Sequence, residues 1–156
     1  MSYATEAGDA LLVASRALVG VAARSLAGVG DVTLPQFRVL VLVSSRDRTT
    51  VSDLAAALGV HSTSASRLCD RLVRKRLLQR REAAEDRRQT DLFVTAAGRR
   101  LVSRVTQRRR RDLAAIAERM GEAAAADAVR VLRAFAAAAE EALQEADLFG
   151  WETADR

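Results

Sequence analysis

Residues 50–75, TVSDLAAALGVHSTSASRLCDRLVRK, carry two helical patterns that are separated by a glycine. Thr50 and Asp53 have the spacing of a capping box, which predicts the start of a short helix that ends at Gly59. A second helix is predicted over 62–75, because its apolar residues recur at helical spacing. Two helices joined by a short turn that contains glycine are typical of a helix-turn-helix.

The predicted helix over 62–75 has two unlike faces. Its apolar face consists of Ala65, Leu68, Cys69, Leu72 and Val73. Short hydroxyl side chains and arginines dominate the rest, and those expected to contact DNA are Ser62, Thr63, Ser64, Ser66, Arg67, Arg71 and Arg74. Short side chains permit close approach to base edges in a major groove, and arginines reach guanine or phosphate. The alternative is that the serines only cap the helix and the arginines form a solvated face.

The hydrophobic period changes after this helix. Apolar and polar residues alternate around Leu78 and around Leu92, which predicts two strands, and the polar segment 83–89 between them predicts a hairpin with a charged tip. The tip residues expected to contact DNA are Asp86, Arg87 and Arg88. Arginines at such a tip fit a minor groove, whereas the alternative is an ordinary solvated turn.

Further helices are predicted on both sides of this module. Thr33 and Gln36 have capping-box spacing before a buried helix, and Thr95 is placed to cap a long helix. The sequence therefore predicts a mainly α protein with a small β-hairpin wing. We expect a winged helix-turn-helix DNA-binding lobe over 33–95, with dimerisation helices in 1–32 and 96–156. Amphipathic helices at both ends need a partner chain to cover them, and a symmetric homodimer is the commonest arrangement.

Composition excludes several classes of protein. The 156 residues are 49% hydrophobic and 29% charged, which suits a folded domain. Cys69 and His61 are the only cysteine and histidine, so neither a disulfide framework nor a cysteine zinc site can form, and we expect no metal and no cofactor. No cluster of catalytic residues is apparent, so an enzyme is the least expected class. No apolar run is long enough for a membrane span, and we expect a cytoplasmic protein.

Positive charge is concentrated in the middle of the chain. The net charge is 0 over residues 1–60, +11 over 61–111 and −6 over 112–156, and these give the overall +5. A basic segment between neutral and acidic ends indicates a polyanionic partner, and double-stranded DNA is the expected one.

The segment from Thr33 to Leu101 resembles the MarR family of winged-helix transcriptional regulators. The resemblance rests on residues 34–40, 54–60 and 68–72, and most specifically on Asp86-Arg87-Arg88 followed by Leu92, Val94-Thr95 and Gly98-Arg99. It implies a homodimer whose two recognition helices enter successive major grooves. It also implies that Arg88 reads a minor groove and that Asp86 holds Arg88 in place.

The same resemblance implies a small, often aromatic, acid as effector. By position, the walls of its site would include Arg16, Gln36 and Phe37. The alternative is that Phe37 packs in the core and that Arg16 is exposed. The sequence departs from the family pattern at Arg76, where glycine is usual after the recognition helix, so the bend into the first strand is expected to differ. Cys69 is expected to pack as a small apolar side chain.

The arginine run 108–111 has two interpretations. It is either a solvated face that pairs with the acidic last helix, or an anion-binding or DNA-flanking site. In both cases one or two of its members must point inward or toward the partner chain. For the whole chain we expect a homodimeric repressor of palindromic operators that a small-molecule effector releases. The alternatives are an architectural protein that coats DNA with little sequence preference, and a module that docks another protein.

Overall fold

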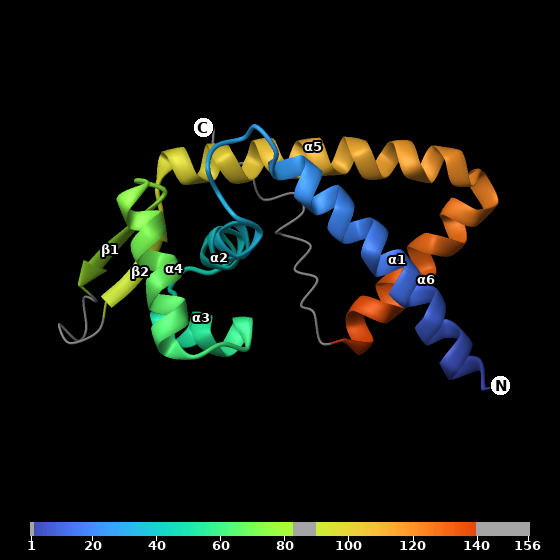
Figure 1. Cartoon of the computed structure of the whole chain (residues 1–156), viewed down its shortest axis with the longest axis horizontal. Helices are drawn as coiled ribbons and strands as arrows, with labels where there is room; N and C mark the ends of the chain where they lie inside the picture. Colours follow the sequence, from blue (N-terminus) through green and yellow to red (C-terminus); the bar gives the residue numbers. More distant parts are fainter. Residues whose placement is uncertain (1, 83–89, 140–156) are drawn as a thin grey trace. The chain divides into compact units, whose positions relative to one another are not determined.

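The described residues form six helices and one two-stranded hairpin (Figure 1). The computed structural model describes residues 2–82 and 90–139, and the chain divides into two compact units, Met1–Arg109 and Arg110–Arg156. The elements in chain order are α1 (Tyr3–Leu26), α2 (Leu34–Ser44), α3 (Val51–Leu58), α4 (Ser62–Arg74), β1 (Leu78–Glu82), β2 (Thr90–Val94), α5 (Ala96–Met120) and α6 (Glu122–Ala138). Their order and type confirm the predicted mainly α fold with a hairpin wing.

Local hydrogen bonds set the starts of α2 and α3. Thr33 and Gln36 form the predicted capping box, with the Gln36 side chain accepting the Thr33 N–H at 3.2 Å. Thr50 and Asp53 form the second box, and hydrogen bonds from the Thr50 backbone N–H and hydroxyl lower the pKa of Asp53. Gly59 ends α3 in the left-handed conformation, with φ of 65°.

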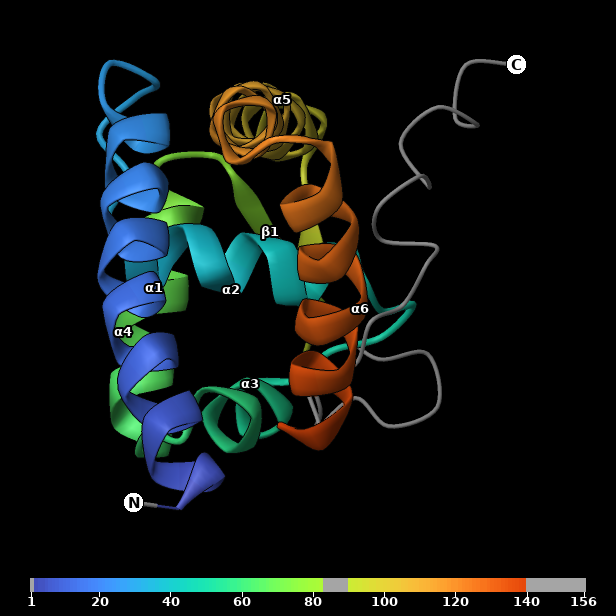
Figure 2. The same ribbon diagram turned by 90° about the vertical axis from the view of Figure 1, so that its right-hand side faces the viewer.

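The core of the first unit lies where α2, α3 and α4 meet the first part of α5. In both views α2 lies between residues 96–109 of α5 and α3 (Figures 1 and 2). The side chains with no exposed surface include Val39, Leu40, Leu54, Ala65, Cys69, Leu72 and Val105. Three of them belong to the predicted apolar face of α4, which is therefore confirmed as the face that packs.

The hairpin is joined tightly to the start of α5. β1 and β2 pair antiparallel, with Leu78 opposite Val94. The Thr95 hydroxyl donates to the Arg76 carbonyl at 2.8 Å and accepts the Gly98 N–H at 3.0 Å, so Thr95 caps α5 as predicted. A Cβ at Gly98 would lie 2.6 Å from Cγ1 of Val94 and would also collide with the Leu77 carbonyl oxygen. Only glycine therefore fits at this crossing.

Two helices carry exposed apolar side chains. Only the C-terminal end of α1 packs into the first unit, through residues such as Val21 and Leu26. The exposed large apolar residues of α1 include Leu12, Val13, Leu18 and Val19. In the second unit, α6 has no buried residue between Glu122 and Ala138, and Val129, Val131, Leu132 and Phe135 are exposed. Residues 140–156 of the expected dimerisation region lie outside the described residues.

Replacing Gly98 with alanine should lower the free energy of unfolding by about 2–3 kcal/mol, because the new methyl group has no space between α5 and the hairpin. Urea denaturation followed by circular dichroism measures the change. Gly8→Ala is the matched control: no atom lies within 4 Å of a Cβ at position 8 in α1, so this variant should be neutral or slightly more stable. Equal stability of the Gly98→Ala variant and the wild type would contradict the close approach.

Candidate DNA-binding surface

The outer face of α4 presents the residues that the sequence predicts to contact DNA. Ala65, Cys69 and Leu72 are fully buried on the inner face. The exposed side chains of α4 are Ser62, Thr63, Ser64, Arg67, Arg71 and Arg74, while Ser66 is half-buried. His61 occupies the N-cap position, and its side chain makes no capping hydrogen bond to α4. The structure thus brings three arginines together on one exposed helical surface.

One acidic side chain of this helix is neutralised by the hairpin. Asp70 lies between Arg67 and Arg71 in the sequence, and its carboxylate forms an ion pair of 2.9 Å with the Arg80 guanidinium of β1. Both side chains are part-exposed, so the pair contributes at most about 1 kcal/mol to stability. Its larger consequence is electrostatic, because an unpaired carboxylate here would repel phosphate. The pair also fixes the first strand against α4.

The second strand of the hairpin is attached to the loop between α2 and α3. The Arg48 guanidinium pairs with the buried Asp91 carboxylate at 3.1 Å, and the Leu92 N–H donates to the Thr49 carbonyl at 2.8 Å. On β1, the Arg81 guanidinium lies 5.0 Å from the centre of the Phe93 ring. Asp86, Arg87 and Arg88 lie outside the described residues.

The bend after α4 has the geometry that favours glycine, although arginine occupies it. Arg76 has φ of 57°, the only positive φ of a non-glycine residue in the described part of the chain. The Arg76 N–H donates to Val73 and the Leu77 N–H donates to Leu72, which is the Schellman arrangement at a helix end. Arginine in place of the expected glycine therefore leaves the bend intact, but Arg76 adopts a strained backbone conformation.

Two arginines of the run 108–111 contact α1. The Arg108 guanidinium donates to the Ala27 carbonyl at 2.7 Å, and that of Arg109 donates to the Ser25 hydroxyl at 3.4 Å. Arg109 also lies over the Phe37 ring, 5.3 Å from its centre. Burial lowers the pKa of Arg109, and within the described ranges its Nη2 atom is buried without a hydrogen-bond partner. These two arginines point inward, as both interpretations of the run allow.

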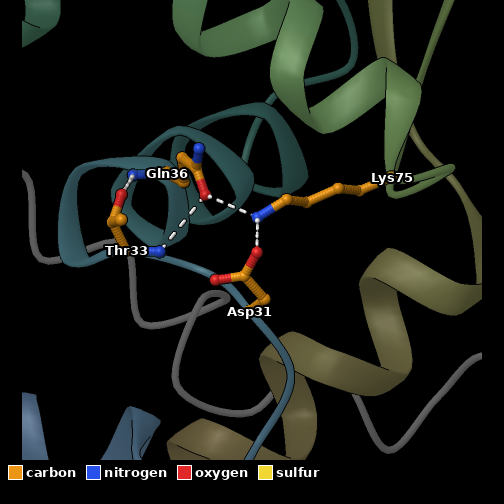
Figure 3. Close-up of polar contacts among 4 residues, drawn as sticks. All are labelled: Asp31, Thr33, Gln36 and Lys75. Carbon is orange, nitrogen blue, oxygen red and sulfur yellow. Dashed lines mark hydrogen bonds and ion pairs between the residues drawn. The ribbon is translucent and has the colours of Figure 1, made fainter.

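The three residues named for an effector site have different surroundings. Phe37 and Gln36 are both buried in α2. The Gln36 side chain accepts hydrogen bonds in its capping box and from the Lys75 ammonium (Figure 3). Arg16 is exposed on α1, before the part of that helix that packs. The structure thus adds Arg109 to the neighbourhood of Phe37 and places Arg16 on the surface.

The described residues give little support to a reactive thiol, a metal site or a membrane span. Burial raises the pKa of the Cys69 thiol, which keeps it protonated and unreactive. Residues 2–82 and 90–139 contain no group of three or more side chains suited to a metal ion. The helices in these ranges are also too short or too polar to cross a membrane.

Sequence patterns did not predict the long-range contacts that hold these elements together. The anchoring pairs Arg48–Asp91 and Arg108–Ala27 join residues 43 and 81 positions apart. No spacing rule links such positions, because the pairs form only after the helices have packed. The one available signal was the charge of Asp91, an acid directly before the apolar strand residues 92–94.

Comparison with known proteins connects this geometry to a family. Residues 30–89 match the sequence profile of the MarR family. YfiV of Bacillus subtilis (strain 168), an uncharacterized HTH-type transcriptional regulator, is 32% identical over 77 residues, which make up 44% of this chain and 48% of YfiV. The match therefore covers about half the length of YfiV.

Solved structures extend the similarity over nearly the whole chain. The crystal structure of RV1404 from Mycobacterium tuberculosis is 38% identical and covers 92% of this chain and 99% of its own, with a TM-score of 0.83. A mutant of S. aureus MepR bound to oligodeoxyribonucleotide shares the fold at 22% identity and a TM-score of 0.62, covering 88% of this chain and 98% of its own.

Replacing Arg76 with glycine should raise the free energy of unfolding by about 0.5–1 kcal/mol. Glycine adopts the left-handed conformation without strain, and this gain exceeds the extra entropy that glycine loses on folding. Chemical denaturation provides the measurement. Arg76→Ala is the control, since it removes the same side chain but keeps the Cβ, and it should show no gain. Equal stabilisation by both substitutions would mean that the arginine side chain, rather than the backbone, is unfavourable.

Proposed function

Because the chain belongs to the MarR family of DNA-binding transcriptional regulators, we propose that it is a homodimeric repressor of a palindromic operator and that a small-molecule effector releases it from DNA. The observation that carries the proposal is the surface of α4, where Arg67, Arg71 and Arg74 are exposed opposite a fully buried face. Arg67 and Arg71 contact base edges in the major groove, and Arg74 contacts phosphate. At the wing, Arg87 and Arg88 contact the adjacent minor groove, and Asp86 holds Arg88 in place.

The exposed apolar residues of α1 and α6 support the homodimer. Side chains such as Val19 and Phe135 are about half exposed in the single chain, which is unfavourable for large apolar groups in water. A second copy of the same chain in a symmetric dimer covers exposed apolar residues of these helices. The dimer then presents two α4 helices to half-sites whose centres lie about one helical turn apart.

Arg109 supports an anionic effector. A carboxylate is the natural partner of a guanidinium, since it accepts two parallel hydrogen bonds. The Nη2 atom of Arg109 is buried and lacks a partner within the described ranges, and the Phe37 ring lies beside it. A small aromatic acid therefore matches both groups. Such an acid would release DNA by binding better to the lobe spacing that does not fit the operator.

A second candidate function is an architectural protein that coats DNA. The net charge of +11 over residues 61–111 favours it, because charge alone gives tight binding without sequence preference. The two functions differ in how binding depends on base sequence, which one experiment measures.

Selection of bound sequences from random duplex DNA should enrich a two-fold palindrome with half-site centres about 10 bp apart. Each α4 helix of a symmetric dimer reads one half-site, and this produces the symmetry. Retention of DNA without an enriched motif would favour the architectural coat. Absence of binding even at low salt would contradict both functions and indicate that the winged helix docks another protein.

Arg71→Ala should weaken binding to the selected operator by about 5- to 100-fold and relax the base preference at one position of each half-site. Equilibrium binding to the operator and to single-base variants measures both effects. Arg119→Ala, an equal loss of charge on α5, should leave the base preference unchanged. A uniform loss of affinity across all sequences in the Arg71→Ala variant would assign this side chain to phosphate instead.

Arg109→Met should abolish the response to small aromatic acids while leaving the fold intact, because methionine fills similar space without a buried charge. With benzoate as the probe, the melting temperature of the wild type should rise in a dose-dependent manner, and that of the variant should stay constant. Arg108→Met is the control and should still respond. Equal benzoate shifts in the wild type and in Arg109→Met would remove Arg109 from the effector site.

A further inference from the structure

Lys75 joins the end of α4 to the segment that connects α1 with α2. Its ammonium lies 3.4 Å from a carboxylate oxygen of Asp31 and 3.4 Å from the side-chain oxygen of Gln36 (Figure 3). Asp31 belongs to the connecting segment, and Gln36 closes the capping box of α2. Lys75 is the C-cap residue of α4, so these contacts attach the C-terminal end of the DNA-binding helix.

The choice of lysine at this position fits the geometry. Lys75 is the only lysine among the 25 basic residues, and all the others are arginines. An ammonium is a compact charge whose three N–H groups can donate to acceptors in different directions, whereas the planar fork of a guanidinium suits two oxygens in one plane. Here the two acceptors come from different elements, the connecting segment and α2.

The connecting segment is built to turn and is held from two sides. Gly28 and Gly30 both have positive φ, at 74° and 86°, and such residues give the backbone freedom that other residues lack. Arg108 of α5 bonds to Ala27 at the start of this segment, and Lys75 of α4 bonds to Asp31 further along. Lys75 therefore connects the end of α4 to the segment that leads from α1 into α2.

We propose that Lys75 is a positioning residue that couples α1 to the DNA-binding helix through Asp31 and Gln36, rather than a phosphate contact. This inference rests on the proposed DNA-binding function and adds a route by which the dimerisation helix influences DNA affinity. Since α1 carries part of the proposed dimer interface, a change in that interface reaches α4 through this clamp, which consists of Asp31, Gln36 and Lys75.

The substitution Asp31→Asn separates this proposal from simple electrostatics, because the two predict opposite signs. Removing a negative charge near a DNA-binding surface strengthens binding if charge alone matters. The clamp predicts that Asp31→Asn weakens operator binding about threefold, the size expected for one exposed ion pair. Asp9→Asn, which removes an equal charge from α1, serves as the control and should not weaken binding.

The test is a double-mutant cycle of operator affinity with Asp31→Asn, Lys75→Met and both together, measured over a range of salt concentrations well below each melting temperature. We expect each single variant to weaken binding, the double variant to be no weaker than Lys75→Met, and the salt dependence to match that of the wild type. Lys75→Arg should bind the operator more tightly than Lys75→Met but less tightly than the wild type.

Three results would overturn the proposal. The first is tighter or unchanged binding by Asp31→Asn, and the second is additive effects in the double variant. The third is a dependence of log affinity on log salt concentration whose slope falls by about one in Lys75→Met, because this change marks a lost phosphate contact. Asp31 is fully exposed, so Asp31→Asn tests the proposal even if Lys75→Met fails to fold. If the wild type does not bind DNA at all, the proposed function is contradicted instead. This result is seen in the wild-type binding measurement, before any variant is compared.

Discussion

Ala65, Cys69 and Leu72 are completely buried along one side of α4, and the arrangement of the DNA-binding surface depends on this contact. Successive residues of a helix are about 100° apart, so fixing one face fixes all the others. A rotation that exposed Leu72 would forfeit about 1.5–3 kcal/mol of apolar burial and would bury a charged side chain in its place. The outward direction of Arg67 and Arg71 is therefore a consequence of core packing. No contact made by the arginines themselves is needed to hold it.

The hairpin is positioned by a second constraint, the close crossing of its base with α5. The Leu77 carbonyl accepts the Thr95 N–H at 3.1 Å, and the absence of a side chain at Gly98 lets the helix start directly against this strand. The ion pairs of Arg80 with Asp70 and of Arg48 with Asp91 then hold the two strands from different sides. The wing is thus attached to α4, to α5 and to the loop between α2 and α3.

Sequence patterns predicted the parts of this structure that depend on near neighbours. Both capping boxes and the buried face of α4 follow from spacings of three or four residues, which a helix turns directly into contacts. The wing strands were predicted from the alternation of apolar and polar residues. The exposure of the arginines was predicted from their position opposite the apolar face of the helix. Lys75 with Asp31 and Arg109 with Ser25 could not be found in this way, because 44 and 84 residues separate the partners. Charge type alone does not choose among so many partners before the fold brings them together.

The two sides of the segment between α1 and α2 are held with very different strength, and this difference suits a regulator. Arg109 is part-buried against Ser25 and Phe37, where a charge is costly to move and costly to leave without a partner. The ion pair of Lys75 with the exposed Asp31 is open to water and salt, and such pairs are easily exchanged for solvent. A protein that changes state in response to a small ligand needs two arrangements that differ by only a few kcal/mol. The weak contact at the end of α4 is therefore the one that a change in α1 alters first, while the part-buried contact at α5 stays in place.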